Sequence, residues 1–284
     1  EFVLAHLAEF DAPTDAWTLV KRNASRSVYC REIDGVRWYL KHFHGKSLSH
    51  KLRRALGRSE ALKEFRFSAE LRENRISCQF ILAARFDPKR RIEWALSQEV
   101  PNAEELSDWH AKNANATGEA RNSLRKTARA LAKLVGKMHA AGIVHNDLHC
   151  GNVLRQSDGT LVLMDLHRMG HTGLLGRRQM ASNLAHLLHD REHLSTRTQR
   201  LRVLRDYLEF NSAAGSLRGW QWLVSQILQR HQAAFYRKRD RRVRGENKYF
   251  RSLKLQQGWR ARVVLDSKRP PAGRVAAPNN YTAV

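Results

Sequence analysis

Apolar and polar positions alternate in the manner of β-strands over much of the first hundred residues. The alternation is clearest over 36–43, where Asp34-Gly35 directly before it favours a tight hairpin turn. The strand-like segments are 17–20, 27–30, 36–43, 80–85 and 92–98. Three of them precede residue 44, so we expect three consecutive antiparallel strands there. The pattern predicts a small, mainly antiparallel sheet.

Helical spacing appears in one segment within this region and dominates after it. The apolar positions Leu62, Phe65, Ala69 and Leu71 recur at helical intervals, and Ser59 before them suits an N-cap. A second helix is predicted over 123–141, ended by Gly142. The sequence thus predicts an α+β fold with one helix beside the sheet and a larger, mainly helical part.

The pattern changes at Glu99-Val-Pro-Asn, where we place a hinge. This divides the chain into an N-terminal lobe, 1–100, and a C-terminal lobe, 101–267. The last segment, 268–284, is rich in proline, asparagine and small residues, so we expect a flexible tail. The fold predicted on these grounds is a two-lobed α+β one.

Composition limits the function classes without choosing one. With 284 residues and 42% hydrophobic content, the chain can bury a core. Its three cysteines lack metal-ligand spacing, which argues against structural zinc or a disulfide framework and favours a reducing cytoplasm. No apolar run approaches the roughly 20 residues that span a bilayer, so any membrane contact should be peripheral. The net charge of +24 attracts phosphates, anionic lipid or nucleic acid alike.

The candidate chemistry lies in the run Val144-His-Asn-Asp-Leu-His-Cys-Gly-Asn-Val-Leu. Asp147 precedes Asn152 by five residues, and Asp165 follows Asn152 by thirteen. These spacings match a kinase catalytic loop and its metal-binding aspartate, so the predicted fold class is a two-lobed, protein-kinase-like one. Asp147 is then the candidate acceptor of the proton of the attacking hydroxyl, and Asn152 and Asp165 are candidate Mg²⁺ ligands. The alternative is that Asp147 and Asn152 cap a turn and Asp165 ends a strand.

A kinase also needs a cation on the nucleotide phosphates, held by a carboxylate of the following helix. Lys41, at the end of the third predicted strand, has the expected place in the order of the chain. Glu64 is the preferred partner because it lies mid-helix at the edge of the apolar face, and Glu60 is the alternative. A solvated surface position is the competing interpretation for all three.

The remaining nucleotide contacts are expected at a turn and at the hinge. The turn Asn23-Ala-Ser-Arg-Ser lacks the glycines that protein kinases place over the phosphates, so Ser25, Ser27 and their amides are the candidates there. Backbone groups of Glu99 and Val100 are the candidates for binding adenine. ATP and Mg²⁺ are the expected cofactors.

With these motifs, residues 17–255 resemble the lipopolysaccharide kinase (Kdo/WaaP) family. The resemblance rests on Lys41, on 64–76, 98–106 and 145–154, and on Met164-Asp-Leu-His-Arg and Asn183-Leu-Ala-His-Leu-Leu. It implies phosphorylation of a heptose or Kdo hydroxyl of the lipopolysaccharide inner core. Asn146 and His149 point the same way, since protein kinases carry arginine and often lysine there, whereas small-molecule kinases carry an Asp-Leu-His-x-Gly-Asn loop.

The resemblance also gives the basic surface an interpretation. Residues 191–274 hold 21 Lys and Arg against 6 acids, a net charge of +15. Such charge can hold a cytoplasmic enzyme peripherally at the anionic inner leaflet, where a glycolipid acceptor lies. A solvated surface is the alternative, and nucleic acid is not expected as a partner. Other hypotheses left open are a small-molecule or protein kinase and a nucleotide-binding pseudokinase.

Overall fold

The computed structural model describes residues 1–44, 57–115, 117–173, 176–190, 195–211, 215–244, 250–254 and 260–264. The chain divides into two compact units, Glu1–Leu228 and Gln229–Val284. The predicted tail, 268–284, lies outside the described residues. The predicted C-terminal lobe, 101–267, extends across the boundary between the two units, and the division of the first unit at residue 100 stays a prediction.

The first unit begins with two short helices and a five-stranded antiparallel sheet of strand order β1-β2-β3-β5-β4. The elements are α1 (Phe2–Ala5), α2 (Leu7–Asp11), β1 (Thr18–Arg22), β2 (Arg26–Ile33), β3 (Val36–Phe43), β4 (Ile81–Asp87) and β5 (Ile92–Gln98). Every predicted strand is confirmed. Asp34 and Gly35 both have positive φ, 53° and 73°, as a two-residue hairpin turn between β2 and β3 requires.

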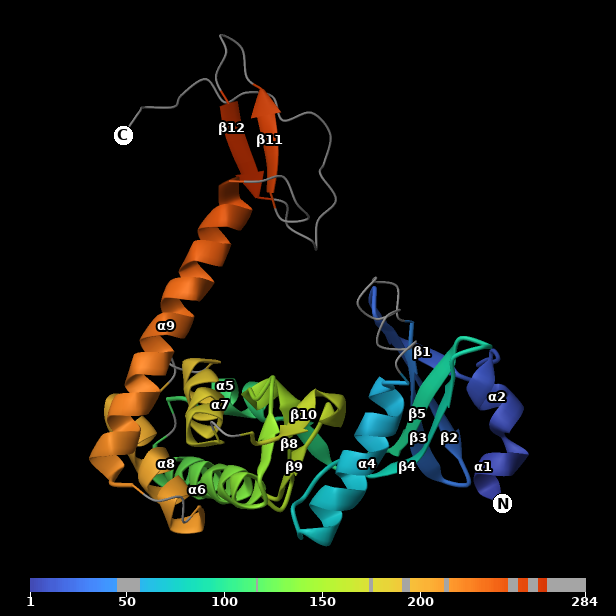
Figure 1. Ribbon diagram of the computed structural model, residues 1–284, viewed down its shortest axis with the longest axis horizontal. Helices are drawn as coiled ribbons and strands as arrows, with labels where there is room; N and C mark the ends of the chain where they lie inside the picture. Colours follow the sequence, from blue (N-terminus) through green and yellow to red (C-terminus); the bar gives the residue numbers. More distant parts are fainter. Residues whose placement is uncertain are drawn as a thin grey trace. The chain divides into compact units, whose positions relative to one another are not determined.

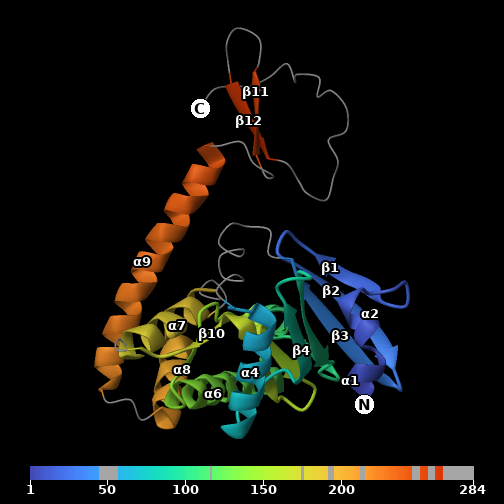
Figure 2. The ribbon, with the colours of Figure 1, turned by 45° about the vertical axis from the view of Figure 1, so that its right-hand side comes forward.

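Helices cover both faces of this sheet, α1 and α2 on one face and α4 (Glu60–Glu73) on the other (Figures 1 and 2). The alternation along β3 explains the arrangement, because successive side chains point to opposite faces. Trp38 and Leu40 are buried with Phe10 of α2 and Trp94 of β5. Lys41 lies on the opposite face of β3, toward α4. On that side Ala61, Phe67 and Leu71 of α4 belong to the larger hydrophobic core.

The start of α4 is fixed by two side chains. Ser59 accepts a hydrogen bond from the amide of Leu62 at 3.0 Å, which confirms the predicted N-cap. The buried carboxylate of Glu93 on β5 accepts from Ser59 Oγ and from the amides of Glu60 and Ala61, at 3.0, 2.6 and 3.2 Å. The sheet therefore positions the helix that carries Glu64.

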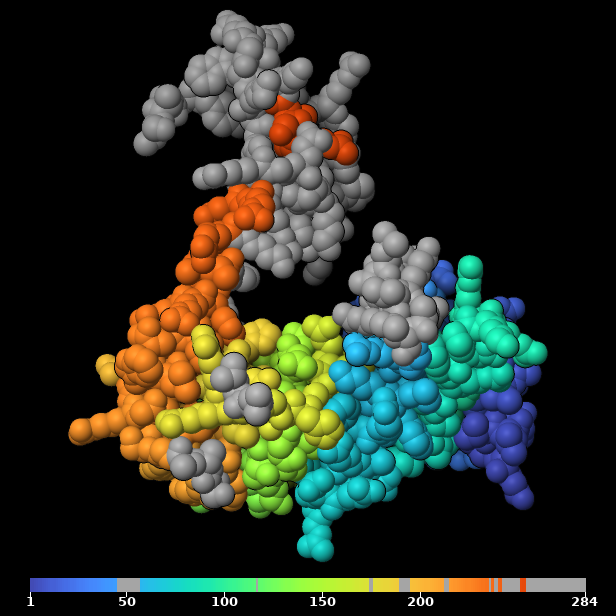
Figure 3. All heavy atoms as spheres, in the orientation of Figure 1, coloured from blue at the N-terminus to red at the C-terminus, as the bar shows by residue number. Residues whose placement is uncertain are grey.

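The rest of the first unit is mainly helical, with short strands around a central loop. Its elements are β6 (Ala103–Glu105), α5 (Leu106–Asn113), α6 (Gly118–Ala140), β7 (Ile143–His145), η1 (Cys150–Asn152), β8 (Val153–Gln156), β9 (Leu161–Leu163), η2 (Leu166–Arg168), β10 (Met169–His171), α7 (Gly176–Asp190) and α8 (Arg197–Phe210). Helix α6 confirms the predicted helix, and Gly142 after it has a φ of 72°. The predicted α+β class is confirmed. Figure 3 shows α4, in cyan, lying against the yellow-green to yellow part of the chain, which includes η2, in agreement with the contacts between α4 and η2.

Helix α9 (Leu217–Arg244) crosses the boundary between the units, and the second unit contains the antiparallel pair β11 (Phe250–Lys254) and β12 (Arg260–Val264). Among the described residues, no helix combines the length and the apolar character that crossing a membrane requires.

Candidate active site

Lys41 of β3 and Glu64 of α4 form a buried ion pair. Lys41 Nζ lies 2.7 Å from Glu64 Oε1, and the two side chains are 12% and 1% exposed. Glu60, the alternative partner, is the first residue of α4, where its amide donates to Glu93. The structure thus brings Lys41 to Glu64, one helical turn further along.

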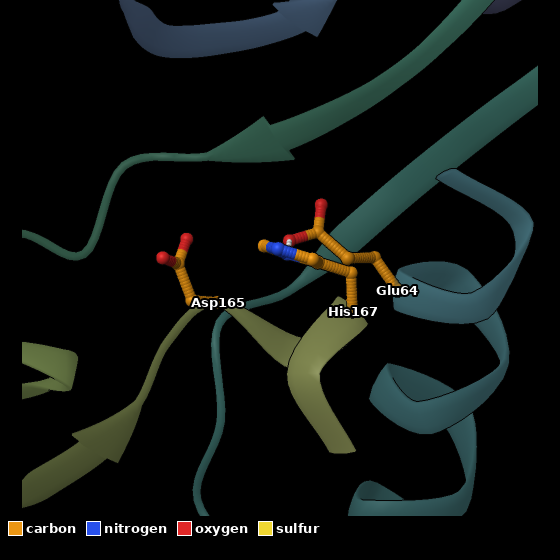
Figure 4. Close-up of side chains that lie close together, drawn as sticks. All are labelled: Glu64, Asp165 and His167. Atoms are coloured by element: carbon orange, nitrogen blue, oxygen red, sulfur yellow. Dashed lines mark hydrogen bonds and ion pairs between the residues drawn. The ribbon is translucent and has the colours of Figure 1, made fainter. Parts of the chain in front are cut away.

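Asp165 joins this pair from the segment after β9 (Figure 4). Its backbone is left-handed, with φ 53° and ψ 48°, and its carboxylate accepts from Lys41 Nζ at 3.2 Å. The Nη1 and Nη2 groups of Arg26 donate to its two oxygens at 3.2 and 3.0 Å. His167 Nδ1 lies 3.1 Å from Glu64 Oε1, with its ring directed toward that carboxylate. The sheet, α4 and η2 are therefore joined by one cluster of polar contacts.

His145 anchors the predicted catalytic loop through hydrogen bonds. This buried ring is 3.0 Å through Nε2 from the carbonyl oxygen of Met164, and its Nδ1 accepts from the amide of Asp147 at 3.2 Å. A carbonyl only accepts and an amide only donates, so these partners assign a neutral imidazole with its proton on Nε2. Burial lowers the pKa of His145, in agreement with that assignment. The amide of His145 donates to Asn183 Oδ1 of α7 at 2.9 Å.

Asp147 and Asn152 lie on this anchored loop. The Asp147 carboxylate is 39% exposed, with Arg168 Nε 3.6 Å away. Asn152 is buried, and its Nδ2 donates to the backbone oxygen of Asp147 at 2.9 Å. The backbone carbonyl of Asn152 accepts from the amide of Met164, the residue directly before Asp165, at 2.9 Å. Asn152 thus links the Asp147 segment to the Asp165 segment.

The predicted nucleotide contacts outside the cluster are placed as follows. Ser25 lies in the turn before β2, where its hydroxyl donates to Asn23 Oδ1 at 2.9 Å. The hydroxyl of Ser27 is buried, 2.7 Å from His44 Nε2. Glu99 follows β5, and its amide donates to the carbonyl of Arg37 at 2.9 Å. Val100 comes next and is half-buried. Neither serine hydroxyl reaches the Asp165 cluster through a hydrogen bond among the described residues.

Comparison with known proteins identifies the family of this chain. Residues 18–210, more than half of the chain, match the lipopolysaccharide kinase (Kdo/WaaP) family. The chain belongs to this family. No curated protein matches this lipopolysaccharide kinase at a significant level. A solved structure, WaaP in complex with acyl carrier protein, is similar with 21% identity and a TM-score of 0.59, over 76% of this chain and 88% of that chain.

The two findings confirm the expected family and fold. At 21% identity the structural likeness shows the fold alone, which is the predicted two-lobed, protein-kinase-like one. Family membership makes the protein a kinase, a transferase of lipopolysaccharide biosynthesis.

Charge within the cluster is balanced. Burial is the largest single influence and alone would raise the pKa of Glu64 and of Asp165, but the ammonium of Lys41 and the other polar neighbours of each carboxylate together lower both values. Burial alone would lower the pKa of Lys41, and the two carboxylates reverse this. Arg26 further lowers the pKa of Asp165. Two cations therefore face two anions at neutral pH.

Asn152 and Asp165 fit a hard divalent cation such as Mg²⁺, which takes oxygen ligands. Asp165 is 21% exposed, and because Asn152 donates through Nδ2, its side-chain oxygen is the atom that can act as a ligand. Glu64, Asp165 and His167 also place possible ligand atoms within 4.8 Å of one another. Lys41 already bonds to both carboxylates of that group, so a protein cation occupies the place of a metal there.

The sequence did not identify two members of the cluster, Arg26 and His167. Arg26 is the only basic residue of the turn 23–27, which was the available signal. His167 stands where Asp-Phe-Gly kinases carry glycine, and the structure shows that this histidine reaches the carboxylate of α4.

Proposed function

We propose that this lipopolysaccharide kinase transfers the terminal phosphoryl group of ATP, with Mg²⁺, to a heptose or Kdo hydroxyl of the lipopolysaccharide inner core. The main support is the pair Lys41–Glu64, which continues to Asp165 beside a loop that presents Asp147 and Asn152. Phosphoryl transfer depends chiefly on positioning and charge neutralisation, and this arrangement can supply both.

Each residue has a task in this proposal. Lys41, oriented by Glu64, contacts the nucleotide phosphates, while Asn152 and Asp165 hold Mg²⁺. The metal, when bound, adds positive charge against the phosphate oxygens. The oxygen of the sugar hydroxyl forms a bond to the terminal phosphorus while the bond from that phosphorus to the ADP oxygen breaks. Asp147 takes the proton that the hydroxyl gives up. Ser25, Ser27, Glu99 and Val100 remain candidate contacts for the nucleotide, through backbone groups in the case of the hinge residues.

The loop geometry supports a sugar as acceptor. Asn146 donates to the carbonyl of Arg168 through its amide and through Nδ2, at 2.9 and 3.0 Å, so it serves as a link between β7 and the end of η2. His149 accepts from the amide of Gly151 at 3.1 Å and caps η1. Neither position supplies the basic side chain through which a phosphorylated activation loop or a protein substrate is bound in protein kinases.

We further propose that the kinase works at the anionic inner leaflet as a peripheral, cytoplasmic enzyme. The support is the net charge of +15 over residues 191–274, since each basic residue near such a surface adds about 1 kcal/mol of attraction. Co-sedimentation with phosphatidylglycerol vesicles, but not with phosphatidylcholine vesicles, is expected at low salt. Equal sedimentation with both would contradict an electrostatic attachment.

The deciding experiment is phosphate transfer from labelled ATP to dephosphorylated core lipopolysaccharide with Mg²⁺. We expect transfer by the wild type and a loss of at least about 100-fold in Asp147→Asn, which keeps the shape of the side chain and removes the base. Asp108→Asn, an exposed carboxylate on α5, is the matched control and should keep wild-type activity.

Two outcomes would overturn the assignment. Equal activity of Asp147→Asn and wild type would remove Asp147 from the chemistry. Thermal stabilisation by ATP without transfer to any acceptor, including free sugars and protein, would indicate a pseudokinase. Transfer to protein or to a soluble metabolite alone would retain the kinase and replace the acceptor.

A further inference from the structure

In the turn between β1 and β2, the backbone amides of Asn23, Ser25 and Arg26 are already engaged. Asn23 Oδ1 accepts from the amides of Ser25 and Arg26, each at 2.9 Å, and the amide of Asn23 donates to the carbonyl of Arg26 at 2.9 Å. A glycine-rich loop binds phosphates through free amides of this kind. Here the Ser25 and Arg26 amides bind an asparagine side chain instead, which favours a side chain as the group that binds a phosphate at this turn.

Arg26 is the side chain of the turn that reaches the site. Its guanidinium group makes two parallel hydrogen bonds to the carboxylate of Asp165, 139 residues further along the chain. The pair is largely buried, with side chains 20% and 21% exposed. Among the described residues, Arg26 and Lys41 are the two cations with an ion pair to Asp165.

The same two oxygens of Asp165 would have to bind a metal. Both oxygens accept N–H groups of Arg26, and a divalent cation beside two protein cations would be repelled. Metal binding at Asp165 is therefore favoured when Arg26 leaves. The nucleotide brings a new set of anionic oxygens to the same space, and a guanidinium fork binds phosphate in the same two-pronged manner as it binds carboxylate.

We propose that Arg26 is a phosphate-binding residue that exchanges partners, holding Asp165 in the nucleotide-free protein and moving to the terminal phosphates of the nucleotide when Asp165 binds metal. This rests on the proposed function, because it requires a metal–nucleotide complex at Asp165. Arg26 then does the work that glycine amides do in protein kinases, and it also supplies the charge that balances Asp165 in the absence of metal.

The exchange predicts opposite effects of one substitution on two ligands. Removing the guanidinium in Arg26→Gln exposes Asp165 to metal, so Mn²⁺ alone, used as a probe for Mg²⁺, should bind about tenfold more tightly. ATP at saturating Mg²⁺, where metal occupies Asp165 in both proteins, should bind about tenfold more weakly, because a charge-assisted contact with the phosphates is lost. Isothermal titration measures both affinities without turnover. Arg26→Lys, with charge but no fork, should fall between wild type and Arg26→Gln.

Arg90→Gln is the matched control, since this side chain is 71% exposed in the turn between β4 and β5 and should leave both affinities unchanged. Unchanged affinities in Arg26→Gln, or affinities for Mn²⁺ and ATP that weaken together, would overturn the proposal and indicate a structural role. Phosphate transfer by the wild type then still supports the proposed function. Opposite shifts of the Mn²⁺ and ATP affinities in Arg26→Gln, without any transfer to lipopolysaccharide by the wild type, would instead support the exchange by Arg26 and reject lipopolysaccharide as the acceptor.

Discussion

The buried carboxylate of Glu93 offers a direct test of how the sheet positions α4. One oxygen of Glu93 accepts from Ser59 Oγ and from the first two amides of the helix. Glu93→Gln keeps the size of the side chain and an acceptor oxygen but removes the negative charge at the positive end of the helix dipole. Hydrogen bonds to a charged group contribute about 1.5–3 kcal/mol each, and the charge at a helix end up to about 2 kcal/mol. Because glutamine preserves part of this, we expect a loss of about 2 kcal/mol in the free energy of unfolding.

Urea denaturation at pH 7 measures this loss, and the dependence of the free energy on urea should keep its slope. Glu73→Gln is the matched control, because Glu73 is exposed in the last turn of the same helix, where a negative charge is not favoured by the dipole. A free energy for Glu93→Gln within about 0.5 kcal/mol of the wild type would refute the reasoning, since surface changes already produce differences of that size. The position of the helix would then not depend measurably on the charge of Glu93.

Three further predictions concern burial and close packing. Lys41→Met should lower the free energy of unfolding by about 3 kcal/mol at pH 7 by leaving Glu64 buried without its cation. In the wild type the folded-state pKa of Glu64 is lowered, so the stability that this carboxylate contributes is lost as pH falls below its unfolded pKa of about 4.3. Urea denaturation at pH 4 should therefore show a smaller difference in the free energy of unfolding between wild type and Lys41→Met than at pH 7. Gly136→Ala should cost about 2 kcal/mol, measured by thermal unfolding, because the new Cβ would lie 2.8 Å from Phe210 Cβ and force α6 and α8 apart. Burial lowers the pKa of His139 to about 4, so the unfolded chain takes up the proton first, and stability should fall as pH drops from about 6.5 toward 4, with a shallower slope in His139→Gln.

Local pattern was sufficient for the elements that carry the site. The alternation over 36–43 fixed which β3 side chains share a face, and so placed Lys41 on the face opposite to Trp38 and Leu40. Ser59 marked the start of α4. The choice between Glu60 and Glu64 was harder, because the two positions lie one turn apart on the same side of a helix. Their distance along the helix axis decides which meets Lys41, and that depends on how α4 packs on the sheet.

Other features had no local signal. The helices α1 and α2 are four and five residues long, too short for a periodic pattern, and the buried ring of Phe10 packs against Trp17 and Trp94. Such helices depend on tertiary packing rather than on propensity. Arg26 is likewise one basic residue among many until folding brings it to Asp165. Residues whose partner is distant in sequence cannot be assigned from spacing.

The charge cluster also bears on how the site is held before nucleotide binds. Lys41 and Glu64 neutralise each other between the sheet and α4, so these two elements would stay paired if the Asp165 segment moved away. Arg26 gains a partner through Asp165, and Asp165 gains both of its cations from the sheet. If the kinase works as proposed, the ion pairs that join the sheet to Asp165 are therefore the same ones that a metal–nucleotide complex would replace. Because these pairs are mostly buried, salt should screen them weakly. Nucleotide affinity should accordingly reflect an exchange of ionic partners rather than the filling of an uncompensated site.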